Sequence, residues 1–272
     1  MPTTTAILID GAYFIKRFRA IEPQNALNAE RAADLAHRWA CKHLTPPNRR
    51  NGGAGAAARA VAQRREERCE LYRIFFYDCP PFTKRMHNPI SRLAINFAES
   101  DEAKFRLELH ERLRAKRKVA LRLGHLSAYT QWTIKPPKIQ DLIAGRITMA
   151  DITADDVTLD FQQKGVDMRI GVDVSSLAFK KQVNQIVLIA GDADFVPAAK
   201  QARREGIDFI LDPMWKSIPP NLNEHIDGLR STCPQVARRP AAAGAAGAAG
   251  AAGAAGAAGA AGAQGAAGVP VN

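Results

Sequence analysis

Long apolar runs are absent from this chain of 272 residues. No stretch approaches the roughly 18 to 20 large apolar residues that a membrane-spanning helix needs. Only the four apolar residues 6–9 precede Asp10 near the N-terminus, which differs from the longer apolar region of a signal peptide. We therefore expect a cytoplasmic protein without membrane contacts.

Cysteine is also scarce, and the motifs of several common enzyme classes are missing. The four cysteines stand far apart without a CxxC pair, so neither a zinc site nor a disulfide framework is predicted. There is no P-loop, no GxGxxG after a strand, no GxSxG elbow and no HExxH. Aromatic residues are few and lie mostly in expected core strands, which argues against an exposed base-stacking platform.

Charge is missing from the end of the chain. No Lys, Arg, Asp or Glu follows Arg239, and residues 241–268 contain only Ala, Gly and a single Gln. Such a segment has too little apolar surface to form a core, so we predict a disordered tail at 236–272 and one folded domain at 1–235. The net charge of +11 therefore belongs to the first 239 residues.

Apolar strands alternate with amphipathic helices along the folded part. This alternation predicts an α/β fold with a mainly parallel central sheet flanked by helices. The expected strands are 5–9, 71–78, 186–190 and 207–211, and the expected helices include 28–44, 165–180 and one capped by Asp194. Two insertions are predicted, a loop running into a short helix at about 45–68 and a second at about 83–156. The second is expected to contain a charged helix at 91–118, a strand pair at 119–126 and 129–134, and one or two short helices before residue 156.

Acids follow several of the expected strands. Because the carboxyl ends of parallel strands line the usual ligand crevice of such sheets, we expect Asp10, Asp192 and Asp194 to converge there, with Asp167 at a helix start. Converging carboxylates repel one another unless a divalent cation neutralises them, and their oxygen atoms suit Mg²⁺ or Mn²⁺. Three other acids have simpler interpretations: an ion pair with Arg169 for Asp173, and ordinary strand ends for Asp78 and Asp212.

Three segments together resemble the motifs of the NYN domain family, which belongs to the PIN-like nuclease superfamily. They are Ile7-Leu8-Ile9-Asp10-Gly11, Lys164-Gly165-Val166-Asp167-Met168-Arg169, and Ile189-Ala190-Gly191-Asp192-Ala193-Asp194-Phe195-Val196-Pro197. Their order and spacing agree with the family, and the resemblance spans roughly residues 5 to 230.

The resemblance implies a three-layer PIN-like fold and a metal-dependent endoribonuclease. The implied catalytic residues are Asp10, Asp167, Asp192 and Asp194; the first three would hold Mg²⁺ or Mn²⁺, and Asp173 and Lys164 are second-tier candidates. Two features depart from many members, which have serines where this chain has Ala190 and Ala193, and an Asn where it has Ala12 or Tyr13. The missing hydroxyls remove possible hydrogen bonds around the metal.

A basic stretch is the expected RNA-binding surface. It comprises Arg114, Lys116, Arg117, Lys118 and Arg122, with no acid among them. Such cations attract a polyanion that an acidic pocket alone would repel, although a solvated helix face explains them equally well. An alternative function is an NYN-fold RNA-binding or regulatory protein with weak or no catalysis. A dehalogenase-type phosphatase using Asp10 as nucleophile would need a second Asp at position 12, which is Ala.

Overall fold

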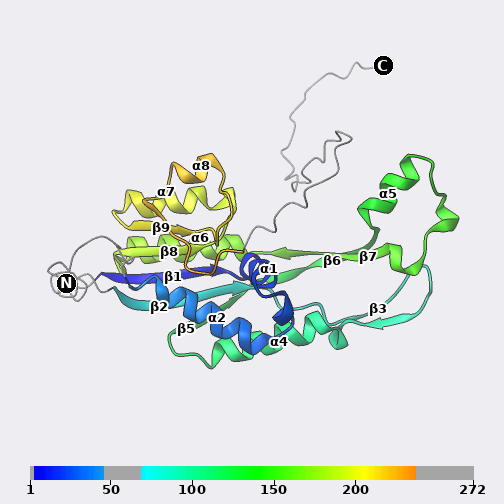
Figure 1. The fold of residues 1–272 in the computed structure, drawn as a ribbon, viewed down its shortest axis with the longest axis horizontal. Coiled ribbons are helices and arrows are strands. Elements are labelled where there is room, and N and C mark those ends of the chain that lie inside the picture. The colour runs from blue at the N-terminus through cyan, green and yellow to red at the C-terminus, as the bar shows by residue number, and fades with distance from the viewer. Residues whose placement is uncertain (1–2, 46–68, 237–272) are drawn as a thin grey trace, which may run out of the picture. The chain divides into compact units, whose positions relative to one another are not determined.

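The computed structural model describes residues 3–45 and 69–236, and residues 1–236 form one compact unit. Most of the expected insertion at 45–68 and of the expected tail lies outside the described residues. Within them, a central sheet has six strands in the order β10-β9-β8-β1-β2-β5, all parallel (Figure 1). The strands are β1 (Thr4–Asp10), β2 (Glu70–Asp78), β5 (Val119–Leu123), β8 (Gln185–Ile189), β9 (Asp208–Asp212) and β10 (Gly228–Leu229).

Helices cover both faces of this sheet, which explains why its central strands are continuously apolar. Ile7 and Ile9 of β1 face one layer and Ala6 and Leu8 face the other, and all four are fully buried. The first layer is α1 (Gly11–Ile21), α2 (Ala29–Lys42) and α4 (Asp101–Arg114); the second is α6 (Val166–Phe179) and α7 (Val196–Arg204), followed by the short α8 (Pro220–Asn223) (Figure 1). The predicted three-layer α/β fold is confirmed.

The strand order reverses at β1. From there the chain proceeds through β2 and β5 on one side and through β8, β9 and β10 on the other. The carboxyl ends of β1 and β8 therefore lie next to each other at the switch point, where ligands bind in open parallel sheets.

The expected strand pair at 119–126 and 129–134 is wrong. Instead, β5 joins the central sheet beside β2, and β6 (His125–Ile134) pairs with β7 (Val157–Lys164) in a separate antiparallel ribbon. Only Gly124 separates β5 from β6, and a Cβ there would lie 2.6 Å from the Lys164 carbonyl oxygen. Glycine thus lets the chain leave the sheet abruptly while passing close to β7.

The expected charged helix at 91–118 is shorter in the structure. Ser100 caps α4, because its Oγ accepts the Ala103 N–H at 3.2 Å, and a hairpin of β3 (Arg85–His87) and β4 (Ala94–Asn96) precedes the helix. Phe105, Leu109 and Leu113 of α4 are buried in the layer shared with α2. Of the range 83–156, then, α4 and β5 are part of the central fold, whereas β6, β7 and the short α5 (Pro136–Ile143) lie outside its sheet.

The helix after β8 begins later than expected. Val196 is its first residue and Pro197 lies in its first turn, so Asp194 does not cap it. Asp192 instead caps a short 3-10 turn at Ala193–Phe195. No helix in the described ranges is long and apolar enough to cross a membrane.

Candidate metal centre

Asp10 is the last residue of β1 and the N-cap of α1. Its Oδ1 accepts the Tyr13 N–H at 3.2 Å, which fixes the carboxylate at the switch point. Gly11 follows because β2 passes very close, so that a Cβ at this position would lie 2.4 Å from the Tyr77 carbonyl oxygen. The Asp-Gly pair therefore both presents a carboxylate and permits tight strand packing.

The turn after β8 presents Asp192 and Asp194. Both are exposed, and Oδ1 of Asp192 accepts the Asp194 N–H at 3.3 Å. Tyr13 packs directly on Gly191, where a Cβ would lie 2.6 Å from the tyrosine ring, and its hydroxyl donates to the Pro213 carbonyl at 2.6 Å. Tyr13 thus ties together the carboxyl ends of β1, β8 and β9, and burial raises its pKa to about 12.

The charge of Asp167 acts on Asp10 and also interacts with those of Asp192 and Asp194. Burial, together with the smaller effect of the Asp167 charge, raises the pKa of Asp10 to about 6 against the lowering effect of the Tyr13 N–H. The pKa of Asp167, in the first turn of α6, is raised by desolvation and then by Asp194 and Asp192. Within the described residues none of the four forms an ion pair, so their mutual repulsion is uncompensated.

This set of oxygen donors fits a hard divalent cation. In the described part of the chain, no three His, Cys, Asp or Glu side chains are already arranged to hold a metal ion. Magnesium, however, is usually held by one or two carboxylates and keeps several of its waters. Asp167 is close enough to Asp10, and to Asp192 and Asp194, for their charges to interact, so these acids offer carboxylate pairs of the kind that magnesium needs.

Asp78 and Asp212 also end strands, but their carboxylates are fully buried and engaged. Asp78 pairs with Arg106 at 2.5 Å and with His110 at 2.8 Å. Asp212 contacts His43 Nε2 at 2.9 Å and accepts the Met214 N–H at 2.8 Å. These contacts agree with their interpretation as structural strand ends.

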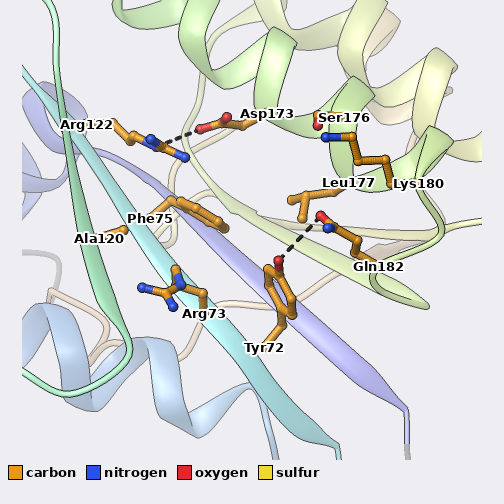
Figure 2. A pocket seen from close by; sticks show the side chains of 10 residues that line it. All are labelled: Tyr72, Arg73, Phe75, Ala120, Arg122, Asp173, Ser176, Leu177, Lys180 and Gln182. Atoms are coloured by element: carbon orange, nitrogen blue, oxygen red, sulfur yellow. Dashed lines mark hydrogen bonds and ion pairs between the residues drawn. The ribbon is translucent and has the colours of Figure 1, made fainter.

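Asp173 lies apart from the acid cluster. Its Oδ2 accepts the Tyr77 hydroxyl at 2.8 Å. The same oxygen lies 3.2 Å from Nε of Arg122 (Figure 2). The expected ion pair with Arg169 is wrong, because the Arg169 guanidinium donates to the Gly165 carbonyl at 3.1 Å instead. Lys164, the other second-tier residue, is exposed at the end of β7, three positions before Asp167.

The predicted basic stretch lies mainly at the other edge of the sheet. Residues 114–118 join the end of α4 to the amino end of β5, whereas Asp10 lies at the carboxyl edge. Lys116 pairs with Asp34 at 2.6 Å, Lys118 donates to the Leu71 carbonyl, and Arg122 pairs with Asp173. Arg114 and Arg117 are exposed and form no ion pair within the described residues.

Two residues near the start of α6 were not among the predicted site residues. His125 at the start of β6 and Arg169 both approach Gly165, directly before the helix that carries Asp167. Arg169 lies inside one of the quoted motifs, two residues after Asp167. No local signal marks His125, because only the pairing of β6 with β7 brings it there.

A parallel sheet between two helical layers, with unpaired acids at its switch point, is the architecture of a PIN-like nuclease fold. The sequence model of the NYN domain family matches residues 107–225, and this match confirms the resemblance seen in the motifs. The match contains Asp167, Asp192 and Asp194 but not Asp10, which reaches them through the pairing of β1 with β8. No curated protein and no solved structure matches the chain.

NYN domains are generally nuclease-like, with nucleic-acid substrates, and typically use divalent metals. The family therefore agrees with the oxygen-donor set at the switch point.

Proposed function

We propose that the protein is a metal-dependent endoribonuclease that hydrolyses RNA phosphodiester bonds at the carboxyl ends of β1 and β8. The observation that carries this proposal is the group of acids at the switch point of an NYN fold, which have no ion-pair partner in residues 3–45 and 69–236. Asp10 and Asp167 have raised pKa values because burial and neighbouring carboxylates disfavour their charged forms. A bound divalent cation would offset this unfavourable negative charge.

Asp10, Asp167 and Asp192 would hold one or two Mg²⁺ or Mn²⁺ ions, with Asp194 beside them. When bound, the cation supplies the Lewis acidity that activates water for in-line attack and offsets charge on the phosphate. The chain keeps Asp10 oriented through its N-cap bond to Tyr13. Tyr13 in turn holds the ends of the neighbouring strands in place, so the carboxylates are preorganised before substrate arrives.

Cations supply the attraction for RNA. Lys164 and Arg169 flank Asp167 in the chain and are exposed, which suits them to contact the phosphates next to the scissile bond. Arg114 and Arg117, at the opposite edge of the sheet, would act on a longer strand through the field of a protein with net charge +11. We place this reaction in the cytoplasm.

A second function is favoured by two alanines. Ala190 is fully buried and Ala193 lies in the turn that carries Asp192 and Asp194, at the positions where many family members have serine. Without those hydroxyls, fewer hydrogen bonds hold water or phosphate near the acids. The same fold would then bind RNA without cleaving it.

The experiment compares cleavage of labelled single-stranded and structured RNA with Mg²⁺, with Mn²⁺ and with EDTA. Asp10→Asn and Asp192→Asn should each lower the rate by about 100-fold or more, because each removes a charged ligand oxygen. Asp208→Asn is the matched control, since Asp208 lies at the amino end of β9 on the opposite edge of the same sheet. Equal cleavage by all variants, or cleavage that persists in EDTA, would overturn the proposal; metal-independent binding without cleavage would establish the second function.

A further inference from the structure

A second hollow lies away from the acid cluster, between the strands β2 and β5 and the helix α6 (Figure 2). Its volume is about 380 Å³, within the range of pockets that hold small organic ligands. It exists because α6 packs over β1 and β2, while Ala120 on the edge strand β5 leaves space beyond the helix. The proposed cleavage reaction does not use this hollow.

A β-bulge shapes the strand wall of the pocket. Thr5 of β1 pairs with Leu71 and Ala6 pairs with Arg73, so Tyr72 is an extra residue in β2. As a result both Tyr72 and Arg73 line the pocket, although neighbouring residues of a regular strand point to opposite faces. The Tyr72 hydroxyl lies 3.4 Å from Oε1 of Gln182 across the pocket (Figure 2).

The charges lining the pocket are mainly positive. Arg122 pairs with Asp173 at 3.2 Å and lies over the Phe75 ring at 5.4 Å. This ion pair therefore forms one end of the pocket and adds almost no net charge. Arg73 comes from the strand wall and Lys180 from the end of α6, and both are exposed. Among the residues that the structure describes, neither has an ion-pair partner. Two cations without ion-pair partners among the described residues, both lining one pocket, favour an anion there.

We propose that this pocket binds the phosphate of a nucleotide through its lining cations Arg73 and Lys180, with the Ser176 hydroxyl as an added donor. The volume exceeds that of a phosphate alone and leaves room for the attached sugar and base beside Tyr72 and the partly apolar floor formed by Phe75 and Leu177. A nucleotide combines the charge and the flat apolar surface that these walls accommodate.

The nucleotide has two possible sources, a free nucleoside phosphate or one unit of an RNA strand. Asp167 and Lys180 lie at opposite ends of α6, about 20 Å apart at the usual rise per residue. An RNA strand that followed α6 would therefore reach both the acid cluster and the pocket. Binding of such a strand rests on the proposed function, whereas binding of a free nucleoside phosphate does not.

Binding is measured by calorimetry with uridine 5′-monophosphate and by fluorescence anisotropy with a labelled twelve-nucleotide oligouridine, both in EDTA. Arg73→Gln and Lys180→Gln should each weaken binding about tenfold, the effect of losing one charge-assisted hydrogen bond. Lys200→Gln and Arg204→Gln are the matched controls, because they remove exposed cations from α7, which does not line the pocket. All four variants should keep wild-type urea midpoints, since they alter surface side chains.

If Arg73→Gln and Lys180→Gln weaken the binding of uridine 5′-monophosphate, the ligand is a free nucleotide. If they weaken only the binding of the oligouridine, the ligand is one unit of an RNA strand. Equal effects of pocket and control variants, or no binding of either probe, would overturn the proposal. Because EDTA removes the metal, Asp10→Asn should bind both probes like the wild type. If the wild type binds at the pocket but does not cleave RNA with Mg²⁺ or Mn²⁺, the result counts against the nuclease proposal alone.

Discussion

Two kinds of aspartate end the strands of this sheet. Asp78 and Asp212, on the strands flanking the switch point, are fully buried and engaged with a buried histidine each. Asp10 and Asp192, at the switch point itself, have no cation beside them among the described residues. An acid at a strand end is therefore a candidate metal ligand only where no cation pairs with it. We expect substitutions of Asp78 and Asp212 to lower the free energy of unfolding, and substitutions of Asp10 and Asp192 to weaken metal binding.

The largest expected effect is on stability. Asp78→Ala leaves Arg106 and His110 without their carboxylate in a buried site, so the free energy of unfolding should fall by about 3 to 5 kcal/mol. Asp194→Ala, at an exposed position, should change it by less than about 0.5 kcal/mol. Urea unfolding followed by circular dichroism measures both, and similar losses for the two variants would remove the distinction between the two kinds of acid.

The pH dependence of stability sharpens the same comparison. Folding raises the pKa of Asp10 from 3.8 to about 6, so its contribution is most favourable below pH 4 and is lost as the pH rises through 6. Asp10→Asn keeps an N-cap oxygen and does not titrate. In EDTA this variant should therefore become more stable than the wild type above pH 6, by about 1 to 3 kcal/mol, with the gap opening between pH 4 and 6.5.

Thermal unfolding of the two proteins across pH 4 to 8 provides the measurement. If the difference in stability between the two proteins stays constant with pH, ionisation of Asp10 does not lower the stability of the folded protein.

The smallest expected effect concerns Tyr13, which links the strand ends at the switch point. Tyr13→Phe removes the hydroxyl that donates to the Pro213 carbonyl and should lower the free energy of unfolding by about 1 kcal/mol. Tyr72→Phe is the control, because its bond to Gln182 is long and exposed, and it should have almost no effect. Equal urea midpoints for the two variants would contradict the role assigned to Tyr13.

The sequence predicted the regular parts of the fold well, for physical reasons. Residues 5–9 and 186–190 are apolar because helices cover both faces of their strands, so their periodicity is unambiguous. The strand β7 was missed because its pairing with β6 lies outside the core, where polar residues such as Gln162 and Gln163 are accepted. The place of β5 was missed because only contacts with distant β2 reveal it.

The candidate site was predicted in part for the same reason. Acids at strand ends are visible in the sequence, but whether Arg106 or His43 contacts them depends on tertiary structure. The position of Asp173 shows the limit most clearly, since its partner is Arg122 from β5 rather than the nearby Arg169.

The central claim, that the switch-point acids form a divalent-cation site, is tested most directly by calorimetric titration of Mn²⁺ into the metal-free protein. We expect saturable Mn²⁺ binding by the wild type and loss of this binding in Asp10→Asn and Asp192→Asn. Asp173→Asn should bind like the wild type, because Asp173 lies on the same helix as Asp167 but is engaged by Arg122. Undiminished binding in the first two variants, or no binding by the wild type, would contradict the central claim.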